Sequence, residues 1–279
     1  MPQHRDQRKV PTAATIAPPR ILQPADVDWP QILDQIPDPP SRLYLSGQLP
    51  VASASLAIVG SRKATVAGRK TAFEIAAELT RAGFRVVSGL AYGIDAAALE
   101  GALHGGGAPL AILGNGLPDI YPAAHRHLAA KIIAAGGALV SEYRPGTPPR
   151  RRNFPRRNRL ISGWSVAVIL LEAATKSGSM GTARHALEQG REVLAFPGPI
   201  TGGGNDGCHG LIQDGAALVT GTDDILAVLA RQEPQCSFSQ DARFLESLAR
   251  EAGTDLERLQ QRTGWSAVRL LRAWSHCQF

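Results

Sequence analysis

Aromatic residues, cysteines and long apolar runs are all scarce in this sequence of 279 residues. Aromatic residues make up only 5%, whereas glycine occurs 29 times, a composition typical of a fold with many tight turns. The cysteines, Cys208, Cys236 and Cys277, are far apart and odd in number, which excludes a disulfide framework and predicts a reducing compartment. Because no apolar run reaches about 18 residues and the N-terminus lacks a hydrophobic signal core, we expect a cytoplasmic protein without a membrane partner.

The motifs of nucleotide-dependent enzymes are missing as well. The segment GRKT (68–71) looks like the end of a P-loop, but Arg69 stands where that motif needs Gly, and Ala64 stands where its first Gly belongs. GSRKAT (60–65) is not the GxGxxG fingerprint of dinucleotide-binding folds. Cys208 and His209 offer at most two ligands, too few for a zinc site. The sequence therefore predicts no ATP hydrolysis, no cofactor and no metal.

Apolar strands alternate with amphipathic helices over most of the chain. This alternation predicts an α/β fold: a Rossmann-like, doubly wound, mainly parallel sheet covered by helices on both faces. The pattern also predicts a strand in RLYLSG (42–47). The remaining expected strands cover 56–60, 85–89, 109–116, 138–143, 165–173 and 192–198, and the expected helices cover 68–83, 93–106, 125–137 and 180–190.

The ends of the chain differ in composition from this central part. Residues 1–20 are polar, basic and proline-bearing, and we expect them to be disordered. The extended Rossmann-like domain then covers 21–230, and a polar linker follows at 231–240. Residues 241–279 predict a small C-terminal domain of short helices with helix-turn-helix spacing but no strand pair for a wing.

Five loops rich in Gly, Ser or Thr follow the predicted strands. In a doubly wound sheet such loops meet beyond the carboxyl ends of the strands, where helix N-termini and free backbone N–H groups can bind phosphate. Any such fold needs glycine-rich turns, so one loop alone says little. Five loops on one edge, with Arg62 and Lys176 in two of them, favour a polyphosphate or nucleic-acid backbone. The loops cover 60–65, 88–95, 113–116, 175–182 and 196–210.

An arginine run carries the charge excess of the chain. Six arginines lie between positions 150 and 159, which equals the formal net charge of +6. Such a run is usually a solvated loop. Here Phe154 and Pro155 would anchor the loop beside the binding edge, and six phosphate-binding guanidinium groups suit an extended polyanion better than a small nucleotide. We expect 148–152 to be a solvated approach and Arg156, Arg157 and Arg159 to contact phosphate.

Acidic residues near this edge do not predict an active site. Asp95 in GID is interpreted as a helix cap rather than a catalytic base. Glu142 and Glu172 end strands, but no His or Ser can be placed beside them for acid–base chemistry. The sequence therefore predicts a binding protein rather than an enzyme.

Several motifs occur together and in order: LAIVGSRKAT, RVVSGLAYGIDAAAL, LAILGNGLPDIYPAAHRHL, FPRRNRLISG and SGSMGTARHALEQGREV. Together they make about residues 40–228 resemble the DNA-processing protein A family, also called DprA or Smf. The resemblance implies a non-enzymatic protein that binds single-stranded DNA and loads the RecA recombinase in natural transformation and recombination. It further implies a homodimer whose interface is formed by residues 210–226, and a protein that acts alongside single-strand-binding protein.

The resemblance also implies which residues line the DNA pocket. They come from the GSR loop, the GLAxGID loop, the FPRRNR segment and the SGS loop. Carried onto this chain they are Gly60, Ser61, Arg62, Gly89, Tyr92, Gly93, Arg156, Arg157, Asn158, Arg159, Lys176, Ser177, Gly178 and Ser179.

Some positions depart from the family pattern, and other functions stay open. Tyr92 stands where many members carry a basic residue, and His209 stands where an asparagine is usual. GSMGTARH (178–185) also has the outline of the phosphoribohydrolase motif PGGxGTxxE, but His185 replaces the acid that this chemistry needs. A sensor module that binds a free nucleotide is a third possibility on the same fold.

Overall fold

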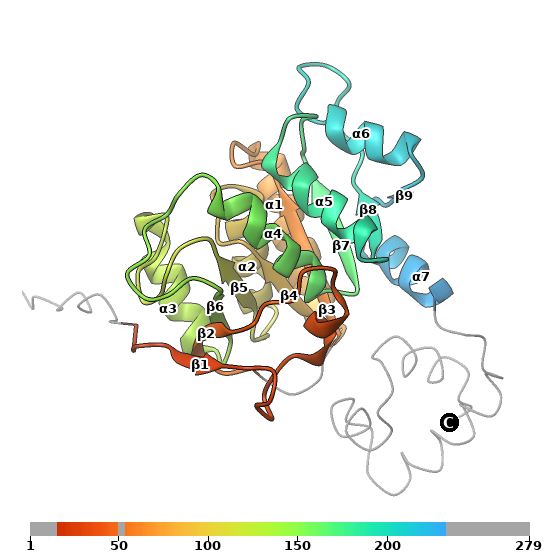
Figure 1. The fold of residues 1–279 in the computed structure, drawn as a ribbon. Helices are drawn as coiled ribbons and strands as arrows, with labels where there is room; N and C mark the ends of the chain where they lie inside the picture. The colour runs from red at the N-terminus through yellow and green to blue at the C-terminus, as the bar shows by residue number, and fades with distance from the viewer. Residues whose placement is uncertain (1–15, 50–53, 233–279) are drawn as a thin grey trace, which may run out of the picture.

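The computed structural model describes residues 16–49 and 54–232. Its centre is a nine-stranded sheet in the order β1-β2-β6-β5-β4-β3-β7-β8-β9, in which β1 and β2 are antiparallel to their neighbours and the other pairs are parallel (Figure 1). The strands are β1 (Arg20–Leu22), β2 (Leu43–Gly47), β3 (Ser55–Gly60), β4 (Arg85–Ser88), β5 (Leu110–Leu113), β6 (Ala138–Ser141), β7 (Ala167–Leu171), β8 (Glu192–Ala195) and β9 (Ala217–Leu218).

Helices connect the parallel strands. At its N-terminus, α1 is capped by the Thr65 hydroxyl, which accepts from the Gly68 N–H at 3.0 Å. It ends next to Gly83, whose φ of 87° a side chain would oppose. The helices are α1 (Val66–Arg81), α2 (Ile94–His104), α3 (Arg126–Ala134), α4 (Asn153–Gly163), α5 (Gly178–Glu188), α6 (Asp206–Gln213) and α7 (Thr222–Gln232), with the 3-10 helices η1 (Gln31–Gln35) and η2 (Ala123–His125).

Alternate residues of each central strand pack on opposite faces of the sheet. On β3, Ala57 and Val59 belong to the cluster under α4 and α5, whereas Leu56 and Ile58 face the cluster of α1 and α2. All four side chains are buried, as expected for a parallel sheet covered on both sides. The predicted Rossmann-like fold is therefore confirmed.

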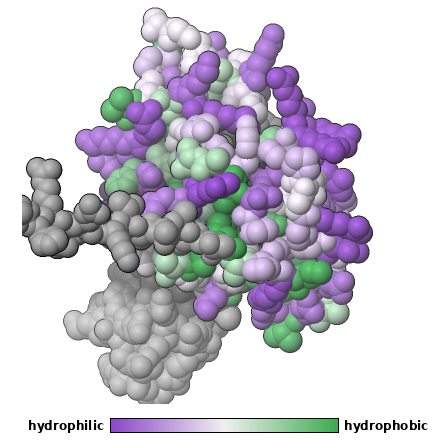
Figure 2. Space-filling view, turned by 90° about the vertical axis from the view of Figure 1, so that its left-hand side faces the viewer, coloured by the Kyte–Doolittle hydropathy of each residue, from purple (hydrophilic) through white to green (hydrophobic). Residues whose placement is uncertain are grey.

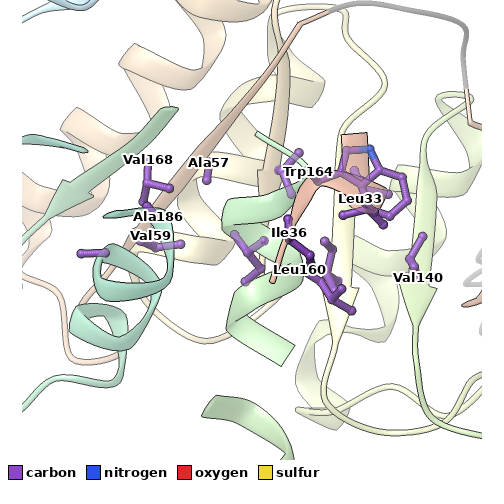
Figure 3. Close-up of a cluster of buried hydrophobic side chains, with 14 of the residues drawn as sticks. Leu33, Ile36, Ala57, Val59, Val140, Leu160, Trp164, Val168 and Ala186 are labelled. Carbon is purple, nitrogen blue, oxygen red and sulfur yellow. The ribbon is translucent and has the colours of Figure 1, made fainter. Parts of the chain in front are cut away.

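The lead-in before β3 completes the layer on the α4 side. Figure 3 shows Leu33 and Ile36 packed against Leu160 and Trp164. A Cβ added at Gly163 would lie only 2.8 Å from Ile36, so η1 and the end of α4 are in close contact. This packing holds α4 against one face of the sheet, with its first turn at the carboxyl ends of β4 and β5.

Two sequence-based expectations need correction. The segment FPRRNR, expected as a loop, lies in α4, because Leu160, Ile161 and Trp164 bury an apolar stripe against the sheet and η1. Residues 16–20, which were expected to be disordered, are among the described residues. Arg20 opens β1, and the Ala17 carbonyl accepts from the Ser46 hydroxyl at 3.3 Å.

Hydrophilic side chains cover most of the face shown in Figure 2, and apolar ones form small separate patches. No helix in the described part of the chain is long and apolar enough to cross a membrane. The predicted linker and short C-terminal helices at 231–279 lie almost entirely outside the described residues, as do Cys236 and Cys277.

Candidate functional site

The candidate site lies at the topological switch point of the sheet. After β3 the chain builds β4, β5 and β6 on one side, and α4 then carries it back to β7 on the other side of β3. Open α/β sheets bind ligands in the crevice at such a point. The two loops there are tied together, because the Glu172 carboxylate after β7 accepts from the Thr65 N–H at 2.8 Å and from the Thr65 hydroxyl.

The GSR loop and the GLAYGID loop pack directly against each other. The Ile94 N–H donates to the Ser61 carbonyl at 3.1 Å. Gly93 has a φ of 78°, and a Cβ there would lie 2.1 Å from the same Ser61 carbonyl oxygen. Glycine is therefore required at position 93 by both conformation and space. The structure brings six of the predicted residues together where the two loops meet: Gly60, Ser61, Arg62, Gly89, Tyr92 and Gly93.

Arg157 is the internal support of this surface. Its side chain is buried, with the residue only 4% exposed, and Nη1 donates to the carbonyls of Gly89 (2.9 Å) and Ile112. Arg157 thus holds the ends of β4 and β5 together from α4. The structure gives this residue a positioning role in place of the predicted phosphate contact.

Asp95 faces Arg157 in the same enclosed space. Its carboxylate accepts from the backbone N–H groups of Gly89 at 3.1 Å and Ala91 at 3.4 Å. Burial raises the pKa of Asp95, and the charge of Arg157 opposes that rise. Burial likewise lowers the pKa of Arg157 to about 10, against the opposing effect of Asp95. Asp95 is not the N-cap of α2, which is Gly93, but it does hold the loop that precedes the helix.

The next two residues of α4 are also buried and bind other segments. Arg159 contacts Glu142 at 2.7 Å and Asp38 at 2.8 Å, and its residue exposure is 4%. The Asn158 amide donates to the Gly178 carbonyl at 3.1 Å, which fastens the SGS loop to α4. The expectation that Arg159 contacts phosphate is not supported by this geometry, because two carboxylates already occupy its guanidinium group.

The exposed part of the site combines one cation with aromatic rings. The Arg62 guanidinium carbon lies 5.4 Å from the centre of the Phe154 ring, and Tyr121 packs against Phe154 with ring centres 5.7 Å apart. Tyr92 and Tyr121 are 49% and 47% exposed. Together these groups border a small pocket of about 40 Å³, also lined by Gly89, Ala91, Pro122 and Arg157. Rings and a guanidinium group at one opening can bind a base and a phosphate of the same nucleotide.

The remaining predicted residues lie on either side of this pocket. Ser177 caps α5, and its hydroxyl lies 2.7 Å from the Ser179 hydroxyl. Lys176 is exposed in the loop after β7. Arg156 has a side chain that is 59% exposed, with Nε 3.6 Å from Glu142. Of the three arginines expected to contact phosphate, only Arg156 presents its side chain to solvent.

Sequence reasoning missed Tyr121 and the ring contact made by His125. The His125 ring meets the Tyr92 ring edge-on, with ring centres 4.9 Å apart, and His125 Nδ1 forms a hydrogen bond with the Leu90 carbonyl at 2.8 Å. Neither residue carries a sequence signal of its own, because the tertiary fold brings the loops together.

Cys208 is buried in the core, and His209 bonds to the Gly198 carbonyl at 3.1 Å. Within residues 16–49 and 54–232 no group of three or more metal-binding side chains comes together.

Comparison with known proteins identifies relatives of this chain. Residues 20–230 match the family described as DNA recombination-mediator protein A. Protein Smf of Escherichia coli is 48% identical over 208 residues, which are 74% of this chain and 55% of that protein. DNA processing protein DprA of Streptococcus pneumoniae is 42% identical over 200 residues, 71% of this chain and 70% of that protein. The chain thus spans little more than half the length of the Smf proteins of Escherichia coli and Synechocystis.

Solved structures agree with these sequence matches. The crystal structure of DprA from Streptococcus pneumoniae has a TM-score of 0.71 and 39% identity, covering 76% of this chain and 75% of that one. A structure of DprA from Helicobacter pylori, described for its single-stranded DNA binding mode, has a TM-score of 0.68 and 29% identity, covering 76% and 96%. With a family match over most of its length and the same fold in two family members, this chain belongs to the DNA recombination-mediator protein A family, the family of DprA and Smf.

Proposed function

We propose that this protein binds single-stranded DNA at the pocket formed by Arg62, Tyr92, Tyr121 and Phe154. The observation that carries the proposal is the exposed Arg62 guanidinium beside three aromatic rings at the switch point of the sheet. A relative of the same fold is described by its single-stranded DNA binding mode, which supports the assignment. A single strand offers the unstacked bases and the accessible phosphates that such a pocket can bind.

Binding at this site should depend little on base sequence. Arg62 supplies charge to a phosphate, and the backbone of the SGS loop at the start of α5 offers N–H groups to a neighbouring one. Phosphate contacts carry no base information, and rings stack on any base. Arg157 and Asn158 contribute indirectly, because they hold the 89–93 and 177–179 loops in place.

The proposed activity is binding without catalysis. The phosphoribohydrolase alternative needs an acid at position 185, where this chain has a histidine whose Nδ1 lies 3.2 Å from Glu188. Incubation of the purified protein with adenosine monophosphate should leave the nucleotide intact. Release of adenine would overturn this part of the proposal.

We further propose that the bound strand is handed to RecA recombinase in natural transformation and recombination, alongside single-strand-binding protein, by a homodimer. The candidate dimer surface is 210–226, which includes the edge strand β9 and the half-exposed Leu218. Size measurement of the free protein, and RecA filament formation on coated single strands with and without the protein, test the two parts separately. A monomer, or no change in filament formation, would contradict them.

Fluorescence anisotropy with labelled oligo-dT and a matched duplex tests the central proposal. The single strand should bind more tightly, with a log–log salt slope of about −0.7 per phosphate neutralised. Arg62→Ala should lower the affinity on the order of tenfold and reduce the slope by about 0.7. Arg81→Ala is the matched control, because Arg81 is exposed in the last turn of α1, at the opposite edge of the sheet. Equal effects of the two variants, or a slope near zero, would overturn the proposal.

A further inference from the structure

A second hollow lies on the other side of the first turn of α4. It has a volume of about 820 Å³ and is formed by the loop between β6 and α4. Four arginines line it: Arg144, Arg150, Arg152 and Arg156. A neighbouring hollow of about 280 Å³ shares Arg144 and Arg156 with it and adds Arg42. We call the two together the arginine groove.

The positive charge of this groove is largely unbalanced. Among the described residues, the side chains of Arg42, Arg144, Arg150 and Arg152 make no ion pair and no hydrogen bond. The one carboxylate in its lining, Glu142, is already bound at 2.7 Å by Arg159 from below. Guanidinium groups gathered without acidic partners repel one another, and a bound anion removes that repulsion.

Hydrogen bonds within the loop and to neighbouring segments also preform the groove. The Tyr143 hydroxyl donates to the Asn153 carbonyl at 3.2 Å, and the Asn153 amide donates to the Gly114 carbonyl at 3.0 Å. The Gly116 N–H donates to the Thr147 carbonyl at 2.9 Å. These hydrogen bonds hold the loop that carries the arginines in one conformation. Ligand binding therefore does not require ordering of the loop backbone.

The groove and the pocket at Arg62 share one wall. In the first turn of α4, Asn153 and Arg156 line the groove, whereas Phe154 and Arg157 line the pocket. The barrier between them is therefore a single helix, about 10 Å across. A strand of a few nucleotides can cross that distance, and a free nucleotide cannot.

We propose that the arginine groove binds the phosphodiester backbone of the same single strand that contacts Arg62 and the aromatic rings at the opening of the pocket. This inference rests on the proposed function. Arginine forks bind phosphate oxygens in pairs, and an open groove lined by five arginines suits a phosphodiester backbone rather than a base. Residues 148–152, expected from the sequence as a solvated approach, thus become part of the binding surface.

Oligo-dT of two lengths tests the groove. A dinucleotide reaches only the opening of the pocket, and about twenty nucleotides also reach the groove. Arg150→Ala/Arg152→Ala should leave the affinity for the short oligonucleotide unchanged, lower that for the long one on the order of tenfold, and reduce its salt slope by about 1.4. The control Arg81→Ala/Lys131→Ala removes the same charge from exposed positions on α1 and α3 and should change neither affinity.

The outcomes separate the two proposals. If the unaltered protein binds both oligonucleotides and the groove variant binds the long one as tightly, the groove is not a binding surface, and the proposed function stands. If the unaltered protein binds neither oligonucleotide, the proposed function fails and the groove falls with it. Equal losses for short and long oligonucleotides would also overturn the groove, because its arginines would then act at the pocket.

Discussion

The arginine run divides into two regions that differ in burial and in the partners of their side chains. Arg157 and Arg159 are 4% exposed and bind carbonyls and carboxylates of the protein itself. Arg150 and Arg152, a few residues earlier, are exposed, line the arginine groove and make no ion pair with any described residue. Arginine serves both regions because its planar fork can satisfy several acceptors in the interior and can bind phosphate at the surface. The same side chain therefore stabilises the site in one region and supplies its charge in the other.

The largest expected effect comes from Arg157→Ala. Removing this side chain leaves Asp95 buried without its opposing charge, so we expect the free energy of unfolding to fall by about 3–5 kcal/mol. Urea denaturation followed by circular dichroism measures it. In the double variant Arg157→Ala/Asp95→Asn the second change removes the unpaired buried carboxylate, so part of the lost stability should be recovered. A loss under about 1 kcal/mol for the single variant would show that the pair is not a support.

A smaller loss is expected for Arg159→Ala. Glu142 would lose its main partner, but Arg156 stays near it at 3.6 Å, and Asp38 is largely exposed. We therefore expect the free energy of unfolding to fall by about 2 kcal/mol, measured in the same way. Arg159→Lys is the informative companion, since an ammonium group cannot bind both carboxylates as a planar fork does. A stability equal to that of the unaltered protein would place Arg159 with the surface arginines.

Gly89→Ala tests the space around the buried pair without removing a charge. A Cβ at this position would lie 2.6 Å from both Arg157 Nη2 and Asp95 Oδ2, so the pair must shift. We expect a stability loss of about 1–2 kcal/mol and weaker binding of single strands, because the shift moves the loop that borders the pocket. Gly204→Ala is the matched control, because a Cβ at Gly204 would meet no neighbouring atom and the residue has no positive φ. Gly106→Ala is unsuitable, since the φ of Gly106 is 85°. Equal stability of the two variants would contradict close packing at Gly89.

The smallest effect on stability is expected in the exposed region. Arg150→Ala/Arg152→Ala should change the free energy of unfolding by less than about 0.5 kcal/mol, since neither side chain has a partner to lose within the described part of the chain. Weaker repulsion among the remaining arginines should offset part of any loss. Thermal unfolding at low and high salt measures both quantities. A loss as large as that of Arg159→Ala would erase the distinction between the two regions.

The fold could be predicted from local patterns, and the candidate site only in outline. Buried strands and amphipathic helices have periods that are readable in the sequence, and the glycine-rich turns follow them at one edge. The GSR, GLAYGID and SGS loops were therefore expected at one site, and the structure brings them together around α4. The antiparallel pairing of β1 and β2 was not expected, because which strand pairs with which is a long-range property.

The sequence alone determined the Rossmann-like sheet, its binding edge and the gathering of six arginines beside it, because periodicity, glycine content and charge are local properties. Only the tertiary structure decided which arginines face solvent. The second half of the arginine run (Arg156, Arg157 and Arg159) falls on helix α4 rather than on a loop, and Leu160 and Trp164 turn one side of that helix toward the core. Arg157 and Arg159 lie on the enclosed side, where β4, β5 and Glu142 supply partners. Burial depends on neighbours distant in sequence, and no local pattern encodes them.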